Sequence, residues 1–129
     1  MPLVRMTMYE GRSAQRKRQL ADIVQEVMLE HFAAPPGDRY QILEELPLGS
    51  IIAEDTGLGI ERSDGIVIVQ ITQQGRSDEQ KQAVYRELAA RLDQADLVRP
   101  EDLIVSVVAN ERADWSFGHG RAQFLTGEL

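Results

Sequence analysis

The sequence contains no cysteine, which excludes disulfides, thiolate nucleophiles and thiolate metal sites. It also lacks an excess of basic residues, because 21 acidic side chains against 14 Lys and Arg give a formal net charge of −7. Nucleic acids and anionic membranes bind proteins through basic surfaces, so neither is an expected partner. The sequence offers no stretch long enough to cross a bilayer and no apolar segment typical of a secretory signal. We therefore expect a cytoplasmic protein.

Histidine is scarce as well, and its placement argues against a metal site. His31 falls in a predicted helix, whereas His119 lies in a distant glycine-rich tail. A metal site needs several converging ligands, so we expect no metal. Ser116 and His119 likewise do not make a catalytic triad.

What the sequence does contain is one pattern used twice. The "GRS" that follows an apolar stretch at its beginning returns after a second apolar stretch, with Gly75 placed 64 positions after Gly11. Each copy precedes apolar residues at helical spacing and then another β-compatible segment. The predicted strands cover residues 3–9, 39–46, 65–72 and 102–110. The sequence therefore predicts two consecutive βαβ units.

The predicted helices have clear start signals. Ser13 is a helix N-cap, and Ser77 forms a capping box with Gln80. Pro100 is expected to end the second helix. Between the units, residues 50–52 are compatible with a short strand. The nearby "GLG" lacks the third glycine and the directly following helix of a dinucleotide-binding motif.

Two βαβ units related by a pseudo-two-fold axis predict an α/β (α+β) fold, with a four-stranded mixed sheet and two helices on one face. We expect a single domain made of repeat one (about 2–46), a connection (47–64), repeat two (about 65–110) and an aromatic tail (111–129). The symmetry places the first strand antiparallel to the third and brings Pro2 toward Gln74, Gly75 and Arg76. Other two-layer α/β arrangements fit the same pattern.

Pro2 is the first candidate for chemistry. A proline at the first residue of a strand is structurally unobjectionable. Removal of Met1, however, would give Pro2 a free secondary amine, which can act as a base, an acid or a nucleophile toward a carbonyl. Asp38 precedes the strand expected beside the first, so it should lie close to Pro2 and favour the protonated amine. As an ordinary turn residue, Asp38 would instead bond nearby backbone.

Arg76 and Arg12 occupy equivalent places in the two repeats, and the common interpretation is a solvated arginine at a helix start. The helix dipole slightly disfavours a cation there. Only Arg76 is expected near Pro2, so it is the candidate to bind a substrate carboxylate, with Arg12 as its structural twin.

The last stretch, "DWSFGHGRAQFLTGEL", contains the only Trp and two of the three Phe. These aromatic residues either line a small pocket or pack against a partner subunit.

Pro2 after Met1, the two βαβ repeats and the arginine after the third strand together resemble the tautomerase superfamily, whose enzymes use an N-terminal proline. The segments "DRYQI", "EDTGLGI", "PEDLIVSV" and "DWSFGHGRAQFLTGEL" look like the malonate semialdehyde decarboxylases of that superfamily. The resemblance spans nearly the whole chain. It implies a homotrimer without a cofactor and with a small carboxylate-bearing carbonyl compound as substrate.

The resemblance also assigns roles. It implies that Pro2, Asp38 and Arg76 are catalytic, with Pro2 kept protonated. It further implies an apolar wall made of Trp115, Phe117, Phe124 and Leu129. Gln74 departs from the decarboxylase pattern, which has a second arginine at this position, although an amide can still donate a hydrogen bond to a carboxylate.

The expected reaction is decarboxylation of malonate semialdehyde to acetaldehyde and carbon dioxide, with promiscuous hydratase activity. One alternative is a tautomerase or hydratase of another 2-oxo or unsaturated acid, for which a neutral Pro2 would act as a base. A second alternative is a non-enzymatic oligomeric binding protein in which Pro2 is inert and the aromatic residues fill an interface.

Overall fold

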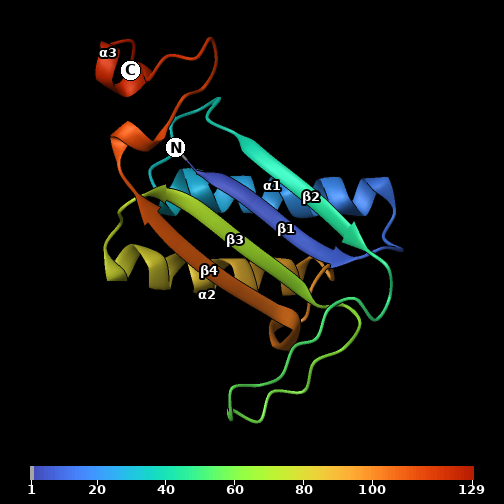
Figure 1. Cartoon of the computed structure of the whole chain (residues 1–129). Helices are drawn as coiled ribbons and strands as arrows, with labels where there is room; N and C mark the ends of the chain where they lie inside the picture. Colours follow the sequence, from blue (N-terminus) through green and yellow to red (C-terminus); the bar gives the residue numbers. More distant parts are fainter. Residues whose placement is uncertain (1) are drawn as a thin grey trace.

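Each half of the sequence folds into the predicted βαβ unit in the computed structural model, which describes residues 2–129 (Figure 1). Repeat one forms β1 (Leu3–Tyr9), α1 (Ala14–His31) and β2 (Tyr40–Leu46). Repeat two forms β3 (Val67–Gln74), α2 (Asp78–Gln94) and β4 (Leu103–Asn110). The four predicted strands are therefore confirmed, with bounds that differ from the prediction by two residues at most.

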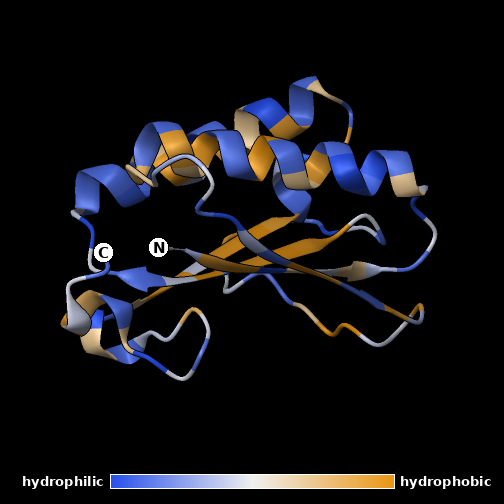
Figure 2. Cartoon of the chain, turned by 90° about the horizontal axis from the view of Figure 1, so that it is seen from above, coloured by the Kyte–Doolittle hydropathy of each residue, from blue (hydrophilic) through white to orange (hydrophobic). Residues whose placement is uncertain are grey.

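The four strands form one mixed sheet in the order β2-β1-β3-β4. Within each repeat the two strands are parallel, whereas the central pair β1 and β3 is antiparallel, with Leu3 opposite Thr72. This is the arrangement that a pseudo-two-fold axis between the repeats predicts, and it excludes the other two-layer arrangements. Figure 2 shows both long helices on the same face of the sheet.

The core lies between that face and the helices. Val4, Met6 and Met8 of β1 are buried in one cluster with the apolar faces of both helices, including Val24 of α1 and Leu88 of α2. Side chains alternate between the two faces of a strand, so the residues between them point to the opposite, open face. The alternation therefore determines which side chains lie on the same face of the sheet as Pro2.

The helix starts follow the predicted caps. The Ser13 hydroxyl accepts a hydrogen bond from the Arg16 N–H (3.2 Å), and Ser77 and Gln80 form the capping box. The end of α2 corrects the prediction, because the helix stops at Gln94, well before Pro100. Asp96 adopts φ 56°, which reverses the chain and lets the N–H groups of the next two residues bond to the Leu92 carbonyl. Pro100 instead begins the 3₁₀ turn η1 (Pro100–Asp102) that leads into β4.

The connection between the repeats also differs from the prediction, because residues 50–52 form no strand. The Tyr9 hydroxyl donates to the Ile51 carbonyl (2.8 Å) and accepts from the Ile51 N–H (3.2 Å), so one side chain replaces a strand partner. Further along, the N–H groups of Gly57 and Gly59 donate to the Asp55 carboxylate (3.1 and 2.8 Å). The "GLG" glycines therefore close a loop around this aspartate.

The tail after β4 contains the 3₁₀ turn η2 (Arg112–Asp114) and the one-turn helix α3 (Gln123–Thr126). Figure 2 shows α3 on the side of the sheet opposite the two long helices. Within residues 2–129, no helix is long and apolar enough to span a membrane.

Candidate active site

Pro2 is buried at the end of the sheet where the central strand β1 begins, and three segments of the chain come together there. It directly precedes Leu3, which pairs with Tyr40 at the start of β2 and with Thr72 near the end of β3. Figure 1 shows the start of β1 between these two strands. The strand register therefore brings the segment around Asp38 and the turn after β3 to Pro2 from either side.

Asp38 is buried, with 5% of its surface exposed, and it ends the turn before β2. Its N–H donates to the Pro35 carbonyl (3.1 Å), and its own carbonyl accepts a bond from Gln25 Nε2 (3.4 Å). Burial raises the pKa of the Asp38 carboxyl group, and the positive charge of Arg76 only partly offsets this effect. The segment thus holds a carboxyl group in a poorly solvated place close to a guanidinium.

Arg76 is largely committed to the backbone. Its Nε donates to the carbonyl of Phe32, the C-cap of α1, at 2.9 Å. Its Nη1 donates to the carbonyls of Gln74 (3.1 Å) and Gly75 (3.2 Å), whereas Nη2 donates no hydrogen bond to residues 2–129. Bidentate binding of a carboxylate needs two free N–H donors side by side, and the Arg76 guanidinium does not offer them. Its Nη2 and its positive charge remain available to a ligand.

Arg12 mirrors this arrangement in the other repeat. Its Nη2 donates to the carbonyls of Gly65 (2.9 Å) and of Leu97 just beyond α2 (3.4 Å). Each turn arginine therefore reaches the carbonyls at the end of the other repeat's helix. Neither is the solvated arginine of the common interpretation, and both contribute to joining the repeats.

This symmetry gives a matched test of Arg76. We expect Arg76→Ala and Arg12→Ala to lower the free energy of unfolding by similar amounts, about 1–3 kcal/mol, because each leaves carbonyls without a charged donor. Only Arg76→Ala should also lower kcat/KM for a carboxylate-bearing substrate, by tenfold or more. Urea unfolding and steady-state kinetics on the two variants check this. Equal losses of kcat/KM would show that proximity to Pro2 does not distinguish the arginines.

Two glutamines end β3 and point to opposite faces of the sheet. Gln73 continues the core-facing row of Val69 and Ile71 and is 0% exposed. The β1–β3 register, continued by one residue, places it opposite Pro2. Within residues 2–129, neither Gln73 Oε1 nor Nε2 has a hydrogen-bond partner. Gln74 lies on the open face, and its Nε2 is buried without a partner among the same residues. Sequence analysis named Gln74 as a substrate-binding residue. Its neighbour Gln73 is a second candidate, because it lies on the same face of the sheet as Pro2 and its amide has no partner within residues 2–129.

The tail aromatics form one cluster at the start of β2. Phe117 stacks on Tyr40 (5.5 Å between ring centroids) and on Trp115 (5.4 Å), and Phe124 meets it edge-on (5.6 Å). Trp115 Nε1 donates to Asn110 Oδ1 at the end of β4 (2.9 Å). Because Tyr40 lies two residues after Asp38, this cluster stands beside the segment that flanks Pro2.

Gln123 holds the tail in this shape. Its Oε1 accepts from the Phe117 N–H and its Nε2 donates to the Gly118 carbonyl, both at 2.9 Å. Leu129, the fourth predicted wall residue, is 54% exposed, and its N–H donates to the Gln123 carbonyl (3.3 Å). The structure therefore brings the three aromatic residues together and leaves the Leu129 side chain largely in solvent.

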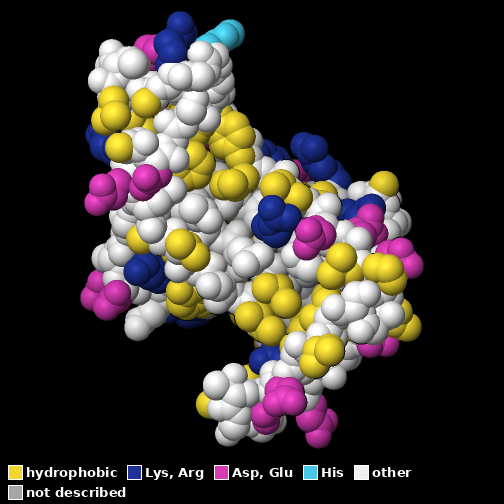
Figure 3. All heavy atoms as spheres, in the orientation of Figure 1, with side chains coloured by type: hydrophobic (Ala, Val, Ile, Leu, Met, Phe, Trp, Pro, Cys, Tyr) yellow, Lys and Arg dark blue, Asp and Glu magenta, His cyan; other side chains and the backbone are white. Residues whose placement is uncertain are grey.

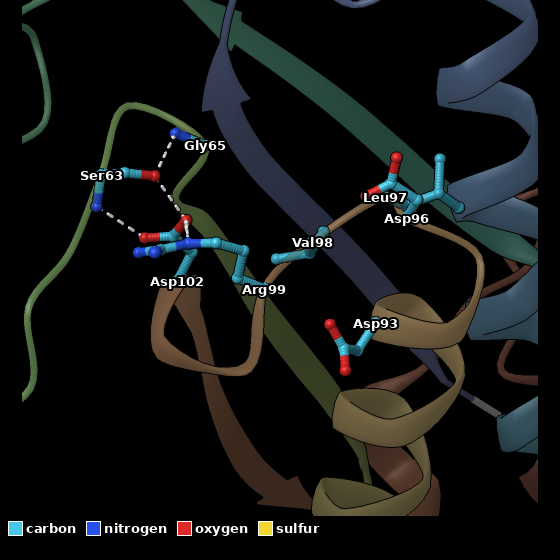
Figure 4. Close-up of a pocket in the computed structure, with 8 residues that line it drawn as sticks. All are labelled: Ser63, Gly65, Asp93, Asp96, Leu97, Val98, Arg99 and Asp102. Atoms are coloured by element: carbon cyan, nitrogen blue, oxygen red, sulfur yellow. Dashed lines mark hydrogen bonds and ion pairs between the residues drawn. The ribbon is translucent and has the colours of Figure 1, made fainter.

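Repeat two contains a counterpart of Asp38 that sequence reasoning missed. Asp102 lies 64 positions after Asp38, the same offset as between Arg12 and Arg76. It is 1% exposed and accepts bonds from Ser63 N (2.7 Å), Ser63 Oγ (2.6 Å) and Arg99 Nε (3.1 Å), as Figure 4 shows. Burial acts to raise the pKa of Asp102, but these hydrogen bonds outweigh it, and the pKa is lowered.

The two aspartates thus hold the same place in the repeat and have opposite pKa shifts. Both this pair and Gln73 carried a signal in the sequence. The 64-residue offset marks Asp102, and strand alternation in "VIVQITQQ" places Gln73 in the apolar row. Within residues 2–129, no group of three or more His, Asp or Glu side chains could hold a metal ion.

Comparison with known proteins identifies the family. Two family models, both described as tautomerase enzyme, match residues 38–118 and 2–60. The chain is 47% identical to the probable tautomerase YrdN of Bacillus subtilis (strain 168) over 129 residues, which cover all of both chains. It is 32% identical to the probable tautomerase YusQ of the same organism over 126 residues, which cover 97% of this chain and 99% of that protein.

Solved structures add a narrower likeness. One malonate semialdehyde decarboxylase, described with decarboxylase and hydratase activities, shares 39% identity, with a TM-score of 0.93 and 98% of each chain covered. The FG41 malonate semialdehyde decarboxylase, solved as inhibited by 3-bromopropiolate, shares 40% identity at the same TM-score, over 98% of this chain and 97% of the other. The native fused 4-OT has the same fold at 20% identity and a TM-score of 0.77, over 96% of this chain and 98% of that chain. The resemblance expected from the sequence is confirmed: the chain belongs to the tautomerase family, with a fold like that of malonate semialdehyde decarboxylase.

Proposed function

We propose that the protein decarboxylates malonate semialdehyde to acetaldehyde and carbon dioxide, without a cofactor, through the amine of Pro2. The observation that carries this proposal is the buried end of β1, where the strand register places Pro2 between the segment of Asp38 and the end of β3 at Gln73. The two decarboxylases at 39% and 40% identity support it, because the likeness extends over nearly the full length of both chains. The amine becomes free once Met1 is removed.

Pro2 acts as a cationic acid in this mechanism. Loss of carbon dioxide from a 3-oxo acid pushes the electron pair of the breaking C–C bond into the aldehyde carbonyl, which becomes an enolate. The ammonium of Pro2 stabilises the developing oxygen charge by hydrogen bonding and can donate its proton. Protonation of the enol carbon then gives acetaldehyde. Asp38 keeps the amine charged, because a carboxylate next to an ammonium raises the pKa of the ammonium.

A covalent route uses the same residue. Neutral Pro2 would attack the aldehyde, lose water and form an iminium that receives the electron pair when carbon dioxide leaves. Water would then release acetaldehyde. Borohydride added during turnover separates the two routes, because it reduces an iminium to a stable adduct on Pro2. We expect no labelled Pro2, since a cationic amine is a poor nucleophile.

The other proposed roles follow from position. Arg76 supplies positive charge and one free nitrogen to the substrate carboxylate, and Gln74 offers an amide N–H. Trp115, Phe117, Phe124 and Leu129 limit the access of water, which favours loss of the neutral carbon dioxide molecule. A cationic acid that polarises a carbonyl also activates a 2-oxo-3-alkynoate toward water, so we expect hydratase activity at the same site.

We further propose that the protein works as a homotrimer. The open face of the sheet carries exposed apolar side chains, among them Ile42 (38% exposed) and Val108 (56%). Figure 3 shows such side chains distributed over this face and over the tail. A partner subunit on this face would also cover Leu129. Light scattering with size-exclusion chromatography measures the oligomer directly, and a monomer would contradict the proposal.

Gln73 gives a prediction in which stability and activity change in opposite directions. Two buried amide atoms without partners cost the fold free energy, so Gln73→Met should raise the free energy of unfolding by about 1–3 kcal/mol. The same change should lower kcat/KM at least tenfold, because the amide faces the reacting groups at Pro2. Gln123→Met is the matched control, since both amide atoms of Gln123 are bonded, and it should destabilise the fold. A Gln73→Met variant with full activity would remove Gln73 from the site.

The alternative enzyme is a tautomerase, which the description of YrdN as a probable tautomerase favours. A tautomerase uses neutral Pro2 as a base and moves a proton without breaking a C–C bond. Proton NMR of the purified protein with malonate semialdehyde distinguishes the two reactions. Acetaldehyde formation supports the decarboxylase, whereas exchange of the C2 protons with solvent and no acetaldehyde supports the tautomerase. Mass spectrometry of the protein purified from cells shows whether Met1 is retained. Retained Met1 would block the amine of Pro2 and favour the non-enzymatic alternative.

A further inference from the structure

The cation of the proposed site, Arg76, is mostly engaged by the backbone and can offer the substrate carboxylate only one nitrogen. Arg76 donates from Nε and Nη1 to three backbone carbonyls, which leaves one terminal nitrogen. Gln74 is uncharged. A small anionic substrate binds weakly without a charged donor, because charge-assisted hydrogen bonds are about twice as strong as neutral ones. A second cation is therefore sought for the same carboxylate, an inference that rests on the proposed function.

A pocket of about 450 Å³ opens where β3 and β4 end. Its lining residues are Gln74, Asn110, Glu111, Arg112, Ala113 and Leu125. Gln74 and Asn110 are register partners across the parallel pair, so they enter the pocket side by side. Strands lie about 4.8 Å apart and rise about 3.3 Å per residue. Continuing the β1–β3 register places Gln73 opposite Pro2, so Gln74 in the pocket lining lies one residue beyond that position, at the end of the sheet where β1 begins.

The pocket contains hydrogen-bond donors that no acceptor in the described part of the chain uses. Gln74 Nε2 is buried and has no partner within residues 2–129. Asn110 Oδ1 accepts from Trp115 Nε1 (2.9 Å), which fixes the amide, while its Nδ2 donates to no residue of the range 2–129. Unsatisfied donors that converge on one cavity favour an anionic or carbonyl-bearing ligand.

Arg112 adds the charge. It comes from η2 in the tail, and its Cζ lies 5.0 Å from the centroid of the Phe124 ring. The ring attracts the guanidinium through a cation–π contact, which uses none of its N–H groups as hydrogen-bond donors and so leaves them for a carboxylate. Arg112 makes no hydrogen bond or ion pair with the described part of the chain. The acid in the lining, Glu111, is engaged in the capping box of η2.

We propose that Arg112, together with Gln74 and Asn110, is the carboxylate-binding subsite of this protein. The ligand class is a three- or four-carbon acid with a carbonyl group close to its carboxylate. In this arrangement the tail delivers the cation from η2 instead of from β3, so the uncharged Gln74 is compensated from another element. Phe124 serves as the support that orients Arg112.

Trp115 provides a direct readout, because it is the only tryptophan and is hydrogen-bonded to Asn110 of the subsite. Malonate is the probe, since it carries carboxylates and cannot turn over as an aldehyde. We expect malonate to change the Trp115 fluorescence, Arg112→Gln to weaken its binding at least tenfold, and Arg112→Lys to retain part of it. Arg121→Gln is the matched control, because Arg121 pairs with Glu128 in the same tail and does not line the pocket. This control should bind malonate as the unchanged protein does.

A second substitution tests the geometry independently. Gln74→Arg places a charge in the same pocket, so it should tighten malonate binding and restore binding to Arg112→Gln. Unchanged malonate binding by Arg112→Gln, or no rescue by Gln74→Arg, would overturn the subsite even in an active decarboxylase. Conversely, malonate binding that depends on Arg112 supports the subsite even when malonate semialdehyde is not turned over, an outcome that contradicts only the proposed function.

Discussion

Blocking the amine of Pro2 should abolish decarboxylation. An extension of Gly-Ser before Pro2 converts the secondary amine into a tertiary amide, which has no proton to donate and no lone pair to attack a carbonyl. We expect no turnover of malonate semialdehyde above background. Pro2→Ala, which leaves a primary amine without the ring that fixes its position, should lower kcat/KM by about 10²–10⁴, the range of a lost positioned acid. Enzyme-coupled detection of acetaldehyde measures both variants.

The control for these variants is their stability. Pro2 precedes the first residue of β1 and donates no strand hydrogen bond, so neither change should lower the midpoint of urea unfolding appreciably. Full activity in either variant would show that Pro2 is not the reacting group, whatever the family of the protein. Loss of activity together with loss of the folded state would be uninformative about the amine, and the unfolding curves detect that case.

We expect Asp38→Asn to affect mainly the activity and Asp102→Asn to affect mainly the stability. Asp38→Asn should lower kcat/KM about tenfold or more, because the ammonium of Pro2 loses the carboxylate that orients it and raises its pKa. Asp102→Asn should leave kcat/KM nearly unchanged, but it should lower the free energy of unfolding by about 2–4 kcal/mol, since Asp102 accepts three hydrogen bonds in a buried place. Kinetics and urea unfolding at pH 7 measure both quantities on both variants.

The pH dependence of stability should separate the aspartates as well. The pKa of Asp102 is lowered in the fold, so its stabilising contribution is present above the unfolded pKa and is lost as the pH falls through the folded pKa. The pKa of Asp38 is raised by burial, so its ionised form opposes folding above the folded pKa, and this penalty lifts on acidification. Asp102→Asn should therefore flatten the acid loss of stability. Asp38→Asn should raise the stability at neutral pH.

Much of the fold was predictable, because local patterns and the repeat agree. An apolar, β-compatible stretch defined β1, and Ser13 and Ser77 marked the helix starts, since these signals depend on residues near in sequence. The end of α2 was missed because the left-handed Asp96, and not Pro100, reverses the chain. The strand at residues 50–52 was wrong because the partner of Ile51 is the hydroxyl of Tyr9, which is distant in sequence.

The site was predictable in its location and less so in its contacts. Symmetry brings Pro2 toward Asp38 and Arg76, since the strand order follows from two βαβ units. The carbonyls that occupy Arg76 belong partly to the end of α1, so only the packing of the repeats reveals that its fork is committed. Arg112 carried no motif at all. Its position depends on how the tail folds back on Phe124, which no local pattern in the sequence determines.

The proposed mechanism depends on a cationic Pro2 that decarboxylates malonate semialdehyde, and the pH profile of that reaction tests it most directly. An α-amine in a peptide has a pKa of about 7.7–8.0, and Asp38 should raise this value for Pro2. For the protein without Met1, we therefore predict acetaldehyde formation with kcat/KM level through neutral pH and falling about tenfold per pH unit above pH 8. The fall should begin at lower pH in Asp38→Asn. A kcat/KM that rises with pH through this range, or no acetaldehyde at any pH, would contradict the account.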